Sequence, residues 1–546
     1  MRYHNQPKEI PEETAKIAKR VFPQGNAYLK LRDELGSIYS DRDFGELFSH
    51  AGRPAESPGN LALVVVMQYM EGLTDRQAAE AVRARIDWKY ALGLKIDDPG
   101  FSYSVLSKFR QRLLEGGAEA QFLERILARA QERELLQKEE QRTDATHVLG
   151  AVKELNRLEL VGETLRAALE ALARAEPTWL QQRITADWIE RYGERLTEYR
   201  LPQKEPERLA LAEAMGRDGL YLLQELAVAE SPADLRQLPE VQTLGQVWEQ
   251  QYAWEGGGVR WRGNDELPPA GERLTSPFDV EVRAARKRQT QWRGYKVHLT
   301  ESCHHEFPFL ITHVHTTMSP DDDSHALTAI QQQLADHERL PTHQLVDSGY
   351  VTADQLVASR RRGIDLLGPV KPDSSWQSKQ PDAFDLSHFD IDWSRQVVTC
   401  PMGQRSISWR QGRDRYGKQT ISVRFSQVNC APCSARPRCT RAKTSGRKLS
   451  LRPRAQHEAL AQARQRQQTE EFWERYRRRS GVEAAISQAT RCFHLRRTRF
   501  RGLTKTHLHH VIIAAALNVT RLVAWLEEPA HACPRRSRLQ KLPLAA

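Results

Sequence analysis

The segment His343-Gln344-Leu345-Val346-Asp347-Ser348-Gly349-Tyr350 carries an aspartate directly after a short apolar run and directly before a glycine turn. Such a run, bounded by turn-forming residues, is typical of a buried strand. Helical patterns precede it over 323–334 and follow it over 353–361, and another apolar run stands at 364–370. Strands connected through helices indicate an α/β unit, in which Asp347 lies at the carboxyl end of a strand, where the active sites of α/β folds gather.

Three further strand patterns lie upstream of this segment. A partly β-branched run at 146–152 follows Asp144, and alternating patterns occupy 292–299 and 308–314. Three antiparallel strands, the first separated from the others by a helical insertion, are therefore followed by two strands that helical crossovers connect. This order predicts an RNase H-like core with a mixed five-stranded sheet, although the pattern alone leaves other α/β folds open. Asp144 begins the first strand, so adjacent central strands can bring it close to Asp347.

A second signature, Tyr476-x-x-Arg479-x-x-x-Glu483, ends 136 residues beyond Asp347. Its members are spaced three and four residues apart, so we expect their side chains to share one face of a helix. With Asp144 and Asp347, Glu483 supplies three carboxylates, which can hold two divalent ions against a phosphodiester. Each residue alone has a simpler interpretation. An aspartate at a strand end is usually a turn cap, and a glutamate near an arginine on a helix is usually a solvated ion pair. Their order along a basic chain favours a shared catalytic site.

Other acidic residues compete for the same roles. The rivals are Asp279, Asp321, Asp322 and Asp323 for an aspartate, and Glu470, Glu471 and Glu474 for the glutamate.

These signatures resemble those of the DDE transposases of bacterial insertion sequences, and the last is similar to their Y-(2)-R-(3)-E motif. The resemblance implies cleavage and transfer of DNA strands, with two Mg²⁺ or Mn²⁺ ions bound by Asp144, Asp347 and Glu483. It also implies that Tyr476, Arg479 and Arg491 orient phosphates. The family motif often continues with a lysine or arginine seven residues after the glutamate. Here that position is Thr490, so Arg491 is assigned the role.

The segment from 43 to 120 has the pattern of short helices separated by tight turns. An apolar helix over 61–67 is broken by Gly72, Thr74 caps the next helix, and a basic helix spans 103–114. We expect Lys108, Arg110 and Arg112 to be exposed on that last helix. The pattern predicts a helix-turn-helix-like DNA-binding domain, with packing of three helices without a DNA role as the alternative. The segment resembles the N-terminal domain of InsH-type transposases.

Charge is unevenly distributed along the 546 residues. Residues 401–546 hold 31 Lys and Arg against 8 Asp and Glu, a net charge of +23, whereas the whole chain carries +11. This strongly basic segment contains Glu483 and favours a polyanionic partner. We predict that the partner is double-stranded DNA. We expect a homodimer on that DNA and no membrane association. The apolar run 511–525 contains Asn518 and Arg521 and falls short of a span of about 20 residues, so a buried helix is expected there.

Seven cysteines in 546 residues do not form a disulfide scaffold, and a cytoplasmic, nucleoid-associated location is expected. Cys400, Cys430, Cys433 and Cys439 fall in a segment with few large apolar residues, so a structural Zn²⁺ site is predicted there. Free thiols and a disulfide are the alternatives. Cys303, Cys492 and Cys533 are expected to be single thiols.

The chain is long enough for three or four units. The expected segments are a lead (1–42), the DNA-binding domain (43–120), the first strand (140–152), a helical insertion (153–270), the continued core (271–370), the cysteine-bearing insertion (371–450), closing helices (451–530) and a basic tail (531–546). A DNA transposase acting on terminal inverted repeats is the leading hypothesis. A catalytically inactive DNA-binding derivative and an RNase H-like nuclease without strand transfer remain as alternatives.

Overall fold

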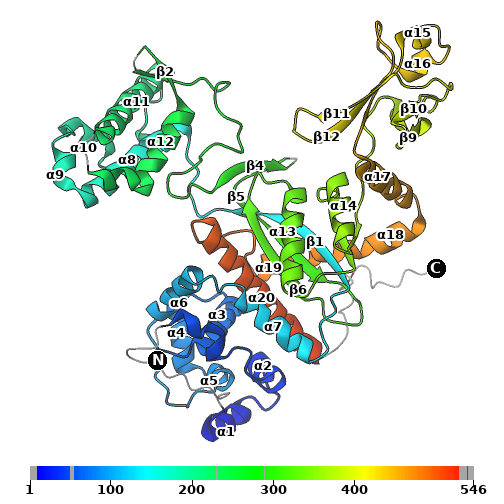
Figure 1. The fold of residues 1–546 in the computed structure, drawn as a ribbon. Helices are drawn as coiled ribbons and strands as arrows, with labels where there is room; N and C mark the ends of the chain where they lie inside the picture. Colours follow the sequence, from blue (N-terminus) through cyan, green and yellow to red (C-terminus); the bar gives the residue numbers. More distant parts are fainter. Residues whose placement is uncertain are drawn as a thin grey trace. The chain divides into compact units, whose positions relative to one another are not determined.

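The computed structural model describes residues 9–48, 55–228, 232–256, 258–287, 289–527 and 538 (Figure 1). The chain is a mixed α/β protein that divides into two compact units. The first unit comprises Met1–Gln137, Ala145–Asp321 and Glu483–Ala546, and the second comprises Lys138–Asp144 and Asp322–Val482. The basic tail expected at 531–546, Arg538 excepted, lies outside the described residues, as does Cys533.

The N-terminal part of the first unit is helical. Its elements are α1 (Glu12–Val21), α2 (Ala27–Leu35), the 3₁₀ helix η1 (Asp41–Leu47), α3 (Pro58–Glu71), α4 (Asp75–Ala84), α5 (Ile86–Leu92), α6 (Ser104–Glu115) and α7 (Gln121–Glu132). The described residues of the segment expected as a lead (1–42) belong to the folded unit. Asn26 caps α2 by accepting hydrogen bonds from two backbone amides, and α2 buries Leu31 and Leu35 in the main core. Helix α7 ends at Glu132, shortly before Glu134 adopts a φ of 56°.

The first unit also contains antiparallel strands. Strand β5 (Thr290–Ser302) pairs with β4 (Arg283–Lys287), with β6 (Ile311–Met318) and with β1 (Glu140–Leu149). The expectation of a five-stranded sheet is wrong, because β4 forms a hairpin with β5 and makes the sheet six-stranded. Helix α20 (Leu503–Glu527) packs against β6, α3 and α7. The Asn518 side chain of α20 both donates to and accepts from the backbone of Ile311, at 2.8 and 2.7 Å.

Helix α20 is long and apolar enough to cross a membrane by length and composition. However, 78% of its most apolar window is buried inside the protein, as in the core helix of a soluble protein. The buried helix expected over 511–525 is therefore confirmed.

The helical insertion has its own apolar core. Its helices are α8 (Arg157–Ala175), α9 (Pro177–Gln181), α10 (Ala186–Tyr192), η2 (Glu198–Arg200), α11 (Glu205–Ala227), η3 (Ala233–Gln237) and α12 (Pro239–Gln251). Leu165, Leu172, Leu222 and Leu244 contribute to this core. A hairpin of β2 (Tyr252–Glu255) and β3 (Gly258–Trp261) follows α12, and the expectation of an entirely helical segment missed it.

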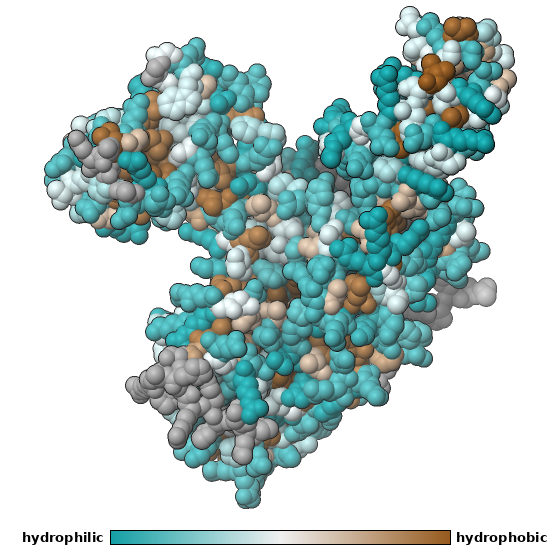
Figure 2. Space-filling model, viewed as in Figure 1, coloured by the Kyte–Doolittle hydropathy of each residue, from teal (hydrophilic) through white to brown (hydrophobic). Residues whose placement is uncertain are grey.

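The second unit contains parallel strands joined by helices. Residues 140–143 of β1 pair with β7 (His343–Val346), and β7 pairs with β8 (Asp365–Leu367). Helix α13 (Asp323–Asp336) precedes β7, and α14 (Ala353–Arg361) connects β7 to β8. Helices α17 (Arg454–Arg466) and α18 (Glu470–Tyr476) follow, and α14 packs on α17. The visible surface over α14 and α17 is strongly hydrophilic (Figure 2).

Between β8 and α17, the cysteine-bearing insertion consists mainly of short strands. Its strands are β9 (Asp390–Asp392), β10 (Val397–Thr399), β11 (Ser408–Arg413), β12 (Gln419–Arg424) and β13 (Lys448–Leu451), accompanied by η4 (Gln377–Lys379), η5 (Leu386–His388), α15 (Gln427–Cys430) and α16 (Arg436–Cys439). Strand β12 pairs antiparallel with β11 and β13. Phe389, Val398, Val423 and Leu451 form part of a small apolar core of this insertion.

Candidate active site

Asp144 and Asp347 follow paired positions of two parallel strands. Thr143 of β1 is opposite Val346, the last residue of β7, and each of these two residues is followed in the chain by one of the two aspartates. Neighbouring strands lie about 4.8 Å apart, which allows both carboxylates to reach one ligand. Strand β7 ends at Val346, as expected, but Asp144 is the fifth residue of β1 rather than its first, because β1 starts at Glu140.

Asp144 is held by an ion pair. Its Oδ2 accepts a hydrogen bond from an Nη2 of Arg479 at 2.6 Å, and the two side chains are only 12% and 14% exposed. Charged hydrogen bonds of this length are among the stronger ones in proteins. Arg479 therefore places a fixed positive charge beside the carboxylate.

Asp347 shapes the turn that follows β7. Its Oδ1 accepts from the backbone amide of Ser348 at 2.6 Å, and its carbonyl oxygen accepts from the amide of Tyr350 at 3.0 Å. Tyr350 is fully buried beneath this turn. Burial raises the pKa of the Tyr350 hydroxyl well above its ordinary value, and the charges of Asp323, Asp144 and Asp347 raise it further.

Asp323 is a third aspartate of this neighbourhood. It is the first residue of α13, and a Cβ added at Gly349 would stand 3.0 Å from its Oδ2. Gly349 thus leaves room for the Asp323 carboxylate as well as permitting the turn. The sequence offered Asp323 only as one of three consecutive aspartates, because spacing along the chain does not show which of them faces Asp347.

The Tyr476–Arg479–Glu483 signature does not lie on one continuous helix. Helix α18 ends at Tyr476, the 3₁₀ turn η6 (Arg477–Ser480) contains Arg479, and α19 (Gly481–Phe493) begins after it. The expectation of a single helix face is therefore wrong. The carbonyl oxygen of Arg478 accepts from the amide of Gly481, in the spacing of a 3₁₀ helix, and also from Arg142 of β1 at 2.8 Å.

Ion pairs attach α18 and η6 to the start of β1. Glu140 accepts hydrogen bonds from Arg475 and Arg478, each at 3.2 Å. Burial raises the pKa of the Glu140 carboxyl, but the two guanidinium groups outweigh this effect, so the pKa lies below its usual value. The Tyr476 ring stacks on Phe472, with centroids 5.7 Å apart and an interplanar angle of 12°.

Glu483 is the third residue of α19 and is exposed. It belongs to the first unit, whereas Asp144 and Asp347 belong to the second. That Glu483 forms one site with Asp144 and Asp347 remains a prediction. Arg491 is also exposed, and its Nε donates to the carbonyl oxygen of Ser487 one helical turn earlier.

The basic side chains of α6 differ in their availability. Lys108 and Arg112 are exposed, and the Arg112 guanidinium lies 4.5 Å from the centre of the Phe48 ring. The expected exposure of Arg110 is wrong, because Asp75 at the start of α4 pairs with it at 2.5 Å and leaves its side chain only 13% exposed. Arg110 therefore stabilises the packing of α4 and α6.

The four cysteines of the insertion come into one neighbourhood. Burial raises the pKa of the Cys439 thiol, Arg447 lowers it, and the charges of Cys430, Cys400 and Cys433 add to the increase. The backbone amide of Gln404 donates to the Cys400 sulfur at 3.3 Å. Among the described residues, however, no three His, Cys, Asp or Glu side chains have a metal-binding arrangement, whether here or at the aspartates. The zinc site stays a prediction.

Comparison with known families adds to this geometry. Residues 399–523 match a family model described as a transposase DDE domain, and residues 17–112 match one described as a transposase domain (DUF772). Both models describe transposase domains. They indicate a transposase of a mobile element. The first match covers Glu483 and the four cysteines, and the second covers α2 to α5 and most of α6. A search of curated proteins found no match to this chain.

Proposed function

We propose that the chain is the DDE transposase of a bacterial insertion sequence. It binds the terminal inverted repeats of its element, cleaves a DNA strand there and joins the freed 3′-hydroxyl to a target. The observation that carries this proposal is the register of β1 and β7, which brings Asp144 and Asp347 to adjacent positions beside Arg479. The transposase matches at both ends of the chain support it.

Asp144 and Asp347 would hold Mg²⁺ or Mn²⁺, with Glu483 as the third carboxylate. Carboxylate oxygens are the donors that such hard cations prefer. When bound, two ions activate a water molecule and neutralise charge on the attacking and leaving oxygens. Arg479 restrains the Asp144 carboxylate, and with Tyr476 and Arg491 it orients phosphates of the substrate.

The remaining parts of the chain have separate roles in this proposal. The elements β1, β5, β6, α13, β7, α14 and β8 follow in the order expected of an RNase H-like core, and this order supports that fold. The N-terminal helices act as an InsH-type DNA-binding domain through Lys108 and Arg112. The protein works as a homodimer on double-stranded DNA in the cytoplasm. Cys400, Cys430, Cys433 and Cys439 would hold a structural Zn²⁺, and the effect of the other three cysteines on the pKa of the Cys439 thiol supports their proximity.

A strand cleavage and joining assay tests this function. Short inverted repeats found in the DNA that flanks the gene supply the labelled end substrate. Full-length protein should cleave it with Mg²⁺ and produce joined product. Asp347→Asn should abolish cleavage yet bind the ends within a few-fold of wild type, because it removes a metal ligand and leaves the basic surface intact. Asp382→Asn, at an exposed aspartate of the same unit, is the matched control.

The outcomes separate the alternatives. Cleavage without joined product identifies a nuclease, and binding without cleavage by the wild type identifies an inactive derivative. Normal cleavage by Asp347→Asn would remove Asp347 from the site.

A further inference from the structure

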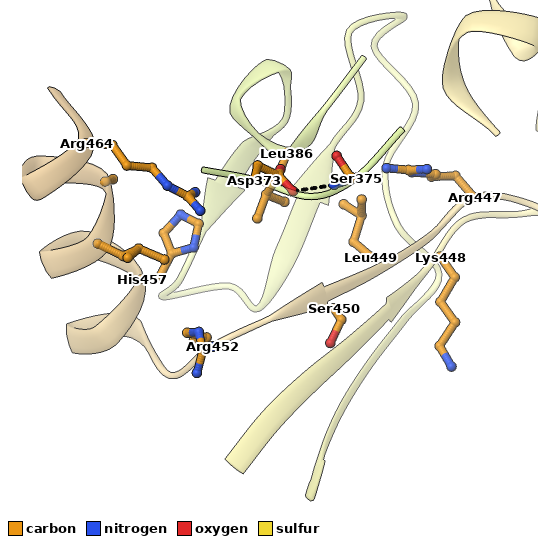
Figure 3. A pocket seen from close by; sticks show the side chains of 12 residues that line it. Asp373, Ser375, Leu386, Arg447, Lys448, Leu449, Ser450, Arg452, His457 and Arg464 are labelled. Carbon is orange, nitrogen blue, oxygen red and sulfur yellow. Dashed lines mark hydrogen bonds between the residues drawn. The ribbon is translucent and has the colours of Figure 1, made fainter. Parts of the chain in front are cut away.

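A pocket of about 350 Å³ lies between β13 and α17 in the second unit (Figure 3). Its wall includes residues of β13, the α17 side chains that face this strand, η5, and the loop after β8. Figure 3 shows Arg464 and His457 extending from α17 toward Asp373 and Leu386. None of the residues assigned to catalysis lines this pocket.

The wall of the pocket is strongly basic. Four of its twelve residues are Arg447, Lys448, Arg452 and Arg464, and the one acidic residue is Asp373. The Asp373 carboxylate accepts a hydrogen bond from the amide of Ser375 at 2.8 Å. So uneven a charge in a concave surface favours an anionic ligand.

Neighbouring arginines show that this imbalance is local. On α17, Arg454 pairs with Glu458 at 2.7 Å and Arg466 pairs with Asp365 at 2.6 Å. Within the part of the chain that the structure describes, the pocket residues Arg452 and Arg464 have no acidic partner. The arginines that line the pocket thus lack, among the described residues, the carboxylate partners that the neighbouring arginines of α17 have.

Two arginines also carry buried donors without a partner. The Nε atoms of Arg447 and Arg464 are buried and make no hydrogen bond. The Arg447 guanidinium is fixed, because its Nη1 donates to the carbonyl oxygen of Cys439 at 2.8 Å. Partial burial lowers the pKa of this guanidinium below its ordinary value. These enclosed Nε atoms do not face the pocket, so an oxyanion there would be held by the charge and the Nη donors of the arginines that line it.

We propose that this pocket binds a single nucleotide of DNA through its phosphate. The proposal rests on the proposed function, which makes DNA the polyanion. Guanidinium groups match the oxygens of a phosphate with two parallel hydrogen bonds, and Leu386, Leu449 and Leu460 provide an apolar wall for the sugar or the base. The volume is at the low end for small-ligand sites, so it admits a nucleotide and excludes a duplex. The nucleotide must therefore come from a strand end or lie outside the helix.

DNA binding by the full-length chain tests this pocket. Fluorescence anisotropy compares a blunt duplex with the same duplex carrying a short single-stranded 3′ extension. Wild-type protein should bind the extended DNA about tenfold more tightly, since one hydrogen-bonded contact between a guanidinium and a phosphate contributes an effect of this order. Arg452→Ala combined with Arg464→Ala should lose this preference and bind blunt DNA within about twofold of wild type. Arg454→Ala, on the same helix but paired with Glu458, is the matched control and should keep the preference.

Competition distinguishes the possible sources of the phosphate. A nucleoside monophosphate should displace the extended DNA at lower concentration than inorganic phosphate does, because the apolar wall contacts the nucleoside. Equal competition by the two compounds, or a double variant that keeps the preference for extended DNA, would overturn the proposal. Failure of the wild type to bind any DNA would instead refute the proposed function. Because binding is measured without cleavage, an inactive catalytic site does not affect this test.

Discussion

Replacement of Gly481 by alanine tests how closely the start of α19 lies against β1. A Cβ at this position would stand 1.9 Å from Nη1 of Arg142, which donates to the carbonyl oxygen of Arg478 at 2.8 Å. Arg142 is only 4% exposed, so its guanidinium cannot turn freely into water. Gly481 itself has a right-handed helical backbone with a φ of −62°, which alanine adopts without strain. The expected effect therefore comes from the displaced guanidinium.

Two opposing effects set the magnitude of this change. Loss of a buried hydrogen bond from a charged donor costs about 1.5–3 kcal/mol. Alanine recovers about 1 kcal/mol through its higher helix propensity. The local opening free energy around η6 should thus fall by about 0.5–2 kcal/mol, which corresponds to roughly 2- to 30-fold faster hydrogen exchange of amides 470–482. Cleavage should fall as well, because Arg479 follows the displaced carbonyl group directly.

Replacement of Gly245 by alanine is a control for which the opposite change in local stability is expected. It lies within α12, and an added Cβ there meets nothing within 4 Å. Gly245→Ala should therefore stabilise its own helix by about 1 kcal/mol and slow exchange there. If Gly481→Ala also slowed exchange of its segment, or left it unchanged, the contact with Arg142 would not be what restrains the η6 turn.

Three further predictions address the site, the cysteines and the charge. Asp323→Asn should lower Mg²⁺-dependent cleavage about 10- to 100-fold, as expected for a group that supports metal-binding carboxylates, and unchanged cleavage would assign Asp323 a structural role only. Purified protein should contain about one zinc ion per chain, lost when Cys430→Ser and Cys433→Ser are combined, whereas metal analysis that finds no zinc contradicts the site. Arg479→Ala should reduce the slope of log affinity against log salt by about one, equally for matched and scrambled ends, and a change in sequence preference would argue against a phosphate contact.

Local sequence signals determined much of the fold. Helix α14 begins after Thr352, whose side chain accepts from the amide of Gln355, and it spans Ala353–Arg361 as its pattern predicts. Gly72 in the left-handed conformation ends α3, and Thr74 caps α4, both as expected. Caps, turns and hydrophobic periods depend on residues within a few positions of one another, so they are legible in the sequence alone.

The tertiary structure decided which charged residues are paired and which face a ligand. The pairing of Arg110 with Asp75, the 3₁₀ turn that Arg142 stabilises, and the position of Asp323 beside Gly349 all join residues far apart in the sequence. The sequence by itself identified Asp144 and Asp347 and predicted that they lie on adjacent strands. It did not show that Arg479 pairs with Asp144. Such pairings depend on how helices and strands pack, because a long charged side chain reaches several groups and packing decides which one it meets.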